Sequence, residues 1–162
     1  MSESSTAQTW SARLAELGIT LPPVVAPLAS YVPAVLTGDL VYTAGQLPLV
    51  DGQLTARGHV SDGAEGRVST DEAYAAARQC ALNALAAIDS VVGIDSIVRI
   101  VKVVGFVASA AGYSAQPKVI NGASDVLGEI FGDAGKHARS AVGVAELPLG
   151  APVEVELIVE VA

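Results

Sequence analysis

Near its C-terminus the chain reads Val153-Glu154-Val155-Glu156-Leu157-Ile158-Val159-Glu160-Val161, and this alternation decides the fold. Successive side chains of a β-strand point to opposite faces of a sheet. The segment is therefore predicted to be a strand with one apolar face, while its three glutamates share the other face with Ile158. Such a strand suits a sheet that is covered by helices on one side.

Two longer segments have apolar residues at helical spacing, and they are predicted to be the helices that cover the sheet. Ser69 and Glu72 have the spacing of a capping box, which predicts a helix from Ser69 that Gly93 stops. A second helix is predicted over Ser114–Phe131, with Pro117 tolerated in its first turn. The other predicted elements are a short helix at Trp10–Leu17 and strands at Val32–Leu36, Leu40–Ala44, Ile97–Ala108 and Arg139–Leu147.

The order β-β-α-β-α-β-β, after a short N-terminal helix, predicts an α+β sandwich with two helices packed on one mixed sheet. A length of 162 residues predicts one domain, with 1–30 as an N-terminal extension and 31–162 as the domain itself. Hydrophobic residues make up 51% of the chain and charged residues only 16%. So few charges leave apolar surface to be hidden between subunits, which predicts an oligomer.

The composition also excludes several classes of function. A net charge of −8 without any basic run argues against a nucleic-acid partner. Met1–Gln8 lacks the features of a secretory signal, and the apolar run Ile97–Ala108 is too short to span a bilayer. The single Cys80 and two histidines give no metal-ligand spacing. We therefore expect a cytoplasmic protein without membrane contact, metal or organic cofactor.

Arg139 opens an otherwise apolar strand, in a chain with only nine Lys and Arg residues. Its planar guanidinium can bind a carboxylate with two hydrogen bonds. Arg139 is thus either a strand-end charge that reaches solvent or the receptor for a small organic acid. His137 returns to the same strand face two residues earlier, where it either lines the same site or is merely solvated.

Glu154 and Glu156 share one strand face, roughly 7 Å apart. They could divide acid and base roles, or they could form the solvated face of an edge strand. The sequence does not decide which of the two faces a cleft. An arginine that binds a carboxylate and a glutamate that positions water form a minimal set for hydrolysing a small imino acid.

The spacing of these groups bears on whether one chain can hold both. If Leu147–Pro152 closes a tight hairpin, Ala145 lies opposite Glu154, and Arg139 is then about 20 Å away at ~3.4 Å per residue. Under that pairing one subunit cannot bring both groups to one small substrate. Either the two strands pair differently or the groups come from adjacent chains.

Several motifs resemble the YjgF/RidA family of reactive-intermediate deaminases, also called endoribonuclease L-PSP. Ala138-Arg139-Ser140-Ala141-Val142 with Leu147-Pro148, followed by Val153-Glu154-Val155-Glu156, resembles the family's C-terminal signature. Leu40–Pro48, which ends in Ala44-Gly45-Gln46-Leu47-Pro48, resembles its N-terminal hairpin and its S-G-Q-[IL]-P motif. The resemblance extends from Tyr31 to Val161.

The resemblance implies a chorismate-mutase-like fold and a homotrimer with small-molecule sites in the clefts between subunits. It also implies hydrolysis of enamine or imine intermediates to 2-keto acids and ammonia. By position, Arg139 would bind the substrate carboxylate and Glu154 would orient or activate water. Tyr31 would close one wall of the cleft, Gly45 would offer backbone groups, and Asn121 would supply a polar contact.

The chain departs from the family pattern in three places. Ala44 replaces the usual serine, Ala141 stands where many members carry cysteine, and both 1–30 and the loop at Asp62–Arg67 are enlarged. These departures keep a second interpretation open, a regulatory trimer that binds a keto acid or a related metabolite without turnover. Endoribonuclease activity ranks below both because the chain is acidic.

Overall fold

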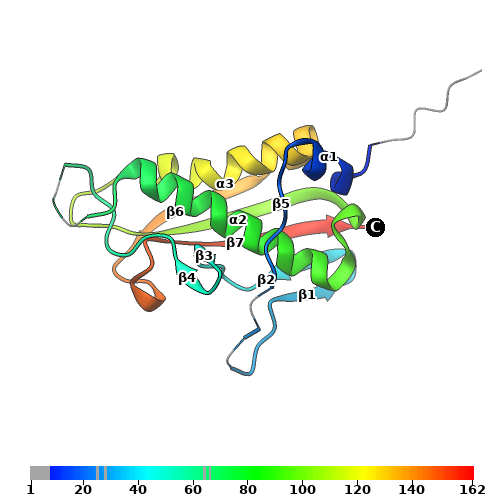
Figure 1. The fold of residues 1–162 in the computed structure, drawn as a ribbon, viewed down its shortest axis with the longest axis horizontal. Helices are drawn as coiled ribbons and strands as arrows, with labels where there is room; N and C mark the ends of the chain where they lie inside the picture. The colour runs from blue at the N-terminus through cyan, green and yellow to red at the C-terminus, as the bar shows by residue number, and fades with distance from the viewer. Residues whose placement is uncertain (1–7, 25, 28, 64, 66) are drawn as a thin grey trace, which may run out of the picture.

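The computed structural model describes residues 8–24, 26–27, 29–63, 65 and 67–162. Its centre is a five-stranded mixed sheet in the order β1-β2-β7-β5-β6. Figure 1 shows α2 and α3 side by side against this sheet. The elements are α1 (Trp10–Glu16), β1 (Ala34–Thr37), β2 (Leu40–Thr43), β3 (Leu49–Val50), β4 (Gln53–Leu54), α2 (Thr70–Val92), η1 (Ile94–Ser96), β5 (Ile97–Ala108), α3 (Gln116–Phe131), η2 (Gly132–Gly135), β6 (Ala138–Val144), η3 (Pro148–Gly150) and β7 (Val153–Val161).

The predicted α+β fold is confirmed, and local chemistry explains where the helices begin and end. Ser69 and Glu72 form the predicted capping box at the start of α2, since each side chain accepts a hydrogen bond from the other residue's backbone N–H. Pro117 lies in the first turn of α3. Gly93 and Gly132 end the two helices with positive φ values of 81° and 56°.

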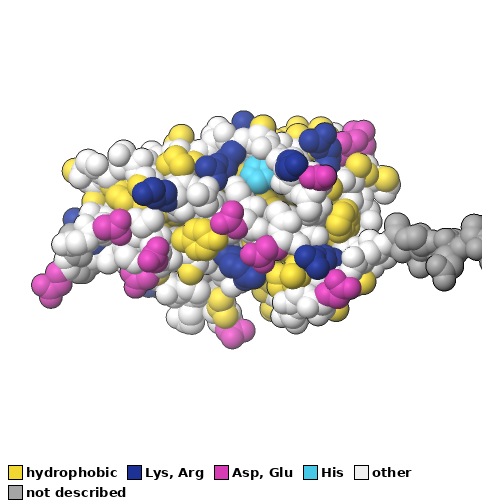
Figure 2. All heavy atoms as spheres, turned by 90° about the horizontal axis from the view of Figure 1, so that it is seen from above, with side chains coloured by type: hydrophobic (Ala, Val, Ile, Leu, Met, Phe, Trp, Pro, Cys, Tyr) yellow, Lys and Arg dark blue, Asp and Glu magenta, His cyan; other side chains and the backbone are white. Residues whose placement is uncertain are grey.

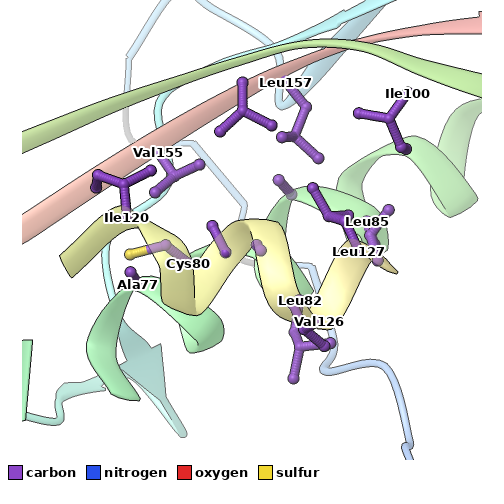
Figure 3. Close-up of a cluster of buried hydrophobic side chains, with 14 of the residues drawn as sticks. Ala77, Cys80, Leu82, Leu85, Ile100, Ile120, Val126, Leu127, Val155 and Leu157 are labelled. Carbon is purple, nitrogen blue, oxygen red and sulfur yellow. The ribbon is translucent and has the colours of Figure 1, made fainter. Parts of the chain in front are cut away.

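The core lies between the two helices and the covered face of the sheet. Figure 3 shows side chains of α2, α3, β5 and β7 meeting there, among them the fully buried Leu85, Ile120 and Leu157. The inward face of α2 is largely alanine, which lets α3 approach closely. At the crossing, Gly122 of α3 lies directly against the backbone carbonyl of Tyr74.

The predicted alternation along β7 is confirmed. Val153, Val155, Leu157 and Val159 are buried beneath the helices, whereas the three glutamates and Ile158 lie on the opposite face and are only partly buried. No helix of the described residues covers that opposite face. It also carries apolar side chains from other strands, including Val35 at 51% exposure and Val142 at 44%.

The hairpin expected between the last two strands is not formed. β6 pairs in parallel with β5, and β7 pairs antiparallel with the other edge of β5. The last two strands are therefore separated by β5, and the segment between them crosses from one side of it to the other. A short hairpin, β3–β4, also follows β2, and Asp51 and Gly52 form the turn between its strands.

The described part of the N-terminal extension is fastened to the domain through α1. The Trp10 indole donates a 2.8 Å hydrogen bond to the carbonyl of Ile97, and its ring packs edge-on against Phe131 with centroids 5.0 Å apart. The backbone and hydroxyl of Ser11 both donate to Asp95, at 2.8 and 2.7 Å. Of the helices in the described residues, none is long and apolar enough to cross a membrane.

The helix crossing generates a stability prediction. Gly122→Ala places a methyl group against the Tyr74 carbonyl, and overpacking of this kind should destabilise the protein by about 1–3 kcal/mol. The matched control is Gly128→Ala on the same helix, where an added Cβ meets no atom within 4 Å. It should stabilise the protein by up to about 1 kcal/mol, because alanine favours the helix. Urea unfolding measures both changes, and equal effects would contradict the close crossing.

Candidate functional site

Three of the residues predicted to form a site meet at one pocket of about 200 Å³. Tyr31, Gly45 and Glu154 all line it, together with Gln46 from the G-Q-L-P turn and Pro148 from the loop before β7. Most of the remaining lining is proline and leucine. The pocket therefore presents one carboxylate among largely apolar walls.

Backbone pairing places Gly45 beside Glu154. Gln46 and Val155 exchange two hydrogen bonds, of 2.8 and 3.0 Å, which extend the sheet past the end of β2. The Glu154 carboxylate then lies so close to the Gly45 α-carbon that any side chain at position 45 would collide with it. Glycine at this position lets the Glu154 carboxylate keep this orientation, whereas a larger residue would make the carboxylate shift.

The environment of Glu154 changes its chemistry. Burial, and secondarily the negative charge of Glu156, raise the pKa of Glu154 above its ordinary value of 4.5. Among the described residues no group donates a hydrogen bond to this carboxylate. A carboxylate of this kind can accept a proton from water more readily than an exposed one. Of the two glutamates that the sequence left open, Glu154 is the one that lines the pocket.

Arg139 and Asn121 meet at a different place, between β6 and α3. The Nη1 of Arg139 donates to Oδ1 of Asn121 at 2.9 Å and to the hydroxyl of Ser124 at 3.1 Å. Its Nη2 reaches the Pro117 carbonyl only at 3.5 Å. No carboxylate pairs with Arg139 in the described part of the chain, and its Nε–H makes no hydrogen bond there. The Nε–Nη2 edge can therefore accept a carboxylate.

Within one chain the two halves of the predicted site lie apart. Arg139 is in register with Val103 and Leu157, whose side chains are buried beneath the helices. Glu154 belongs to the opposite, uncovered face of the sheet. Of the alternatives that the sequence left open, the strands pair differently: β5 lies between them, and the two side chains leave the sheet on opposite faces.

Ser124 was not singled out from the sequence, although a signal was available. It lies three residues after Asn121, a spacing that places both side chains on the same face of a helix. His137 was left open between a site role and solvation, and its ring contacts Ser124 at 2.9 Å. His59 has no such neighbour, and instead contacts the carbonyl of Ala145 and the carboxylate of Glu146.

The arrangement, two helices on one face of a mixed sheet with a motif-bearing strand on each side of β5, defines a chorismate-mutase-like α+β protein. The family model described as "YjgF/chorismate_mutase-like, putative endoribonuclease" matches residues 11–161. The chain belongs to this YjgF family. Protein TCP17 of Trypanosoma cruzi is 40% identical over 152 residues, which cover 93% of this chain and 92% of TCP17.

Solved structures are similar along nearly the whole chain. Protein Atu1372 of Agrobacterium tumefaciens, whose crystal structure is described as having unknown function, is 41% identical with a TM-score of 0.83, over 94% of this chain and 92% of that one. The yjgF gene product of Escherichia coli is 27% identical with a TM-score of 0.61, over 86% and 93% of the two chains.

The raised pKa of Glu154 makes a prediction about stability. A carboxyl whose folded pKa lies above its unfolded value binds protons more strongly in the native state, so its ionisation makes stability fall as pH rises. Glu154→Gln should therefore be more stable than the wild type at pH 7. The difference should shrink as pH falls through the raised pKa of Glu154 toward the ordinary value of 4.5, and should be absent below that value.

Urea unfolding of both proteins at pH 7 and at about pH 4 measures this difference. Glu160→Gln, near the end of the same strand, controls for the loss of one negative charge from a chain of net charge −8. A Glu154→Gln protein that is less stable than the wild type at pH 7 would contradict the assignment.

Proposed function

We propose that this protein acts in the cytoplasm as a deaminase of small enamine or imine intermediates, which it hydrolyses to 2-keto acids and ammonia. Arg139 binds the substrate carboxylate and Glu154 activates water. The observation that carries the proposal is that, in the described residues, Arg139 has no carboxylate partner, its Nε–H makes no hydrogen bond, and its Nη2 has only a long 3.5 Å contact with the Pro117 carbonyl. The resemblance of the motifs around Arg139 and Gly45 to the YjgF/RidA family implies the same reaction class.

The reaction needs little activation by the protein, because an imine carbon is already electrophilic. Water adds to the carbon of the protonated imine as Glu154 accepts one of its protons, which gives a neutral carbinolamine. Glu154 then returns this proton to the nitrogen, and the C–N bond breaks as the carbonyl forms. The hydroxyl proton passes through the Glu154 carboxylate to the released ammonia, so that a 2-keto acid and ammonium leave. No nucleophilic side chain or covalent intermediate is needed. Tyr31 closes one wall of the pocket and the backbone of Gly45 borders the reacting atoms.

A homotrimer with clefts between subunits completes this site. Arg139 lies on the helix side of the edge strand β6, and Glu154 lies on the uncovered face of β7. A second copy that covers the open face brings its own Arg139 and Asn121 to the pocket of its neighbour. The apolar side chains on the open face, among them Val35 and Val142, support burial of this face between subunits.

Ala44 supports a second candidate, a trimer that binds a keto acid or related metabolite without turnover. Alanine lacks the hydroxyl that serine would place beside Gly45, so one polar group is missing near the pocket. The two candidates differ in one measurement. An amino-acid oxidase generates imines in situ, and semicarbazide trapping follows keto-acid formation. No acceleration at high protein concentration supports the binder.

Endoribonuclease activity is disfavoured by charge. Figure 2 shows one face of the molecule, on which Lys and Arg side chains are interspersed with Asp and Glu and do not gather into a basic patch. With a net charge of −8, the chain offers little phosphate neutralisation to an RNA strand.

Removal of the guanidinium tests the deaminase directly. Arg139→Ala should lower kcat/KM for carboxylate-bearing imines about 100-fold, mainly through KM, because charge-assisted hydrogen bonds are worth roughly 1.5–3 kcal/mol. Arg67→Ala, which removes an exposed arginine of the loop before α2, is the matched control and should leave the kinetics unchanged. Unchanged kinetics in Arg139→Ala would refute the assigned role.

Subunit mixing tests whether the site is shared. Arg139→Ala and Glu154→Gln should each have only a small residual kcat/KM as pure trimers. When the two are refolded together in equal amounts, about a quarter of the clefts receive both intact residues, and that share of wild-type activity should return. Absence of recovery, with mixed trimers verified by mass spectrometry, would show that the two residues do not serve one cleft.

A further inference from the structure

We propose that Ser124 and His137 are positioning residues of the carboxylate receptor, and that they hold Arg139 so that only its Nε–Nη2 edge faces the substrate. This inference rests on the proposed function, because it assumes that Arg139 binds the carboxylate. It assigns a role to Ser124, which the family motifs do not include, and to His137, whose role the sequence leaves undecided.

Four groups form a continuous chain of hydrogen bonds behind Arg139. Its Nη1 lies 3.1 Å from the Ser124 hydroxyl, which lies 2.9 Å from Nε2 of His137. The other ring nitrogen of His137, Nδ1, lies 2.6 Å from the carbonyl of Gly135. The chain therefore runs from β6 across α3 and ends on the backbone of η2.

The two ends of this series of hydrogen bonds determine which atoms carry the protons, because the Arg139 guanidinium can only donate and the Gly135 carbonyl can only accept. The Gly135 carbonyl can only accept, so Nδ1 of His137 carries the proton in the neutral ring. Nε2 is then an acceptor, and the Ser124 hydroxyl donates to it. The lone pairs of Ser124 are left for Arg139. Every donor points in the same direction, an order in which each hydrogen bond strengthens the next.

The consequence for Arg139 is a fixed orientation. Asn121 and Ser124 both accept from Nη1, and two acceptors one helical turn apart define the plane of the guanidinium. With only one acceptor, the guanidinium of Arg139 could rotate about that single hydrogen bond. With Nη1 occupied, the remaining free edge is the one formed by Nε and Nη2, whose two parallel donors match the two oxygens of a carboxylate. The receptor is thus specific for carboxylates over carboxamides.

Ser124 and His137 also have the composition of a nucleophile and its base, but the geometry favours positioning. The Arg139 guanidinium donates into the oxygen that would have to attack. Ser124 also lies in the middle of α3, flanked by the buried Ala123. A fluorophosphonate that reacts with serine nucleophiles should therefore leave Ser124 unmodified, and labelling of Ser124 by mass spectrometry would overturn the proposal.

Two matched pairs of variants test the hydrogen-bond chain. Ser124→Ala removes the hydroxyl, whereas Ser124→Thr keeps it. His137→Leu removes the acceptor, whereas His137→Gln offers an amide oxygen near the position of Nε2. The probe is pyruvate, with its dissociation constant measured by calorimetry, and steady-state kinetics give KM and kcat separately.

We expect Ser124→Ala and His137→Leu to raise the pyruvate Kd and the substrate KM about tenfold, with kcat within about twofold of the wild type. Ser124→Thr and His137→Gln should return Kd to within about threefold of the wild type. An unchanged Kd in Ser124→Ala, or equal losses in Leu and Gln at position 137, would overturn the proposal. If Arg139→Ala also leaves the pyruvate Kd unchanged, the proposed function itself fails.

A measurement on the wild-type protein covers the case in which a variant does not fold. Nuclear magnetic resonance of histidine-labelled protein reports which ring nitrogen carries the proton. The chain of hydrogen bonds requires the Nδ1–H form of neutral His137. The Nε2–H form would set the lone pair of Nδ1 against the carbonyl oxygen of Gly135 and would refute the proposed order.

Discussion

The structure depends on the pairing of β5 with two strands of opposite direction. β6 runs parallel to β5 and β7 runs antiparallel to it, so the two motif-bearing strands are held at a fixed register on either side of one buried strand. Because side chains alternate along each strand, this register assigns Arg139 to the covered face and Glu154 to the uncovered face. Close packing of the helices against β5 and β7 then prevents either strand from slipping, since a one-residue shift would bury the glutamates.

Most of the fold could be predicted because its signals are local. The alternation of β7, the capping box at Ser69 and the apolar stripe of α3 are each contained within one segment, and the structure reproduces all three. The arrangement of the last two strands could not be predicted in the same way. A connection between Val144 and Val153 can close a hairpin or cross over a strand, and local sequence does not choose between them. The choice is made by β5, whose two edges both need a hydrogen-bonding partner.

The residues of the site likewise differ in whether local sequence could predict them. Tyr31, Gly45 and Glu154 were identified through motif resemblance, and the pocket brings them together. The contact of Ser124 with His137 was not predicted, because it joins the middle of a helix to the start of a strand thirteen residues later. Its meaning also depends on a backbone carbonyl, that of Gly135, which no residue type reveals. Functional side chains can be proposed from sequence, whereas the groups that orient them are found only in three dimensions.

The two faces of the sheet place different demands on their functional groups, and this explains why each group is on its own face. Arg139 must be held rigidly, and α3 supplies fixed acceptors for it through Asn121 and Ser124. Glu154 must keep a raised pKa, which requires an apolar pocket without donors, and the uncovered face beside Gly45 provides that environment. If both groups lay on one face of one chain, the guanidinium would pair with the carboxylate, lower its pKa and remove its basicity. In the proposed trimer, this separation within the chain would keep the carboxylate receptor and the base apart until a substrate lies between them.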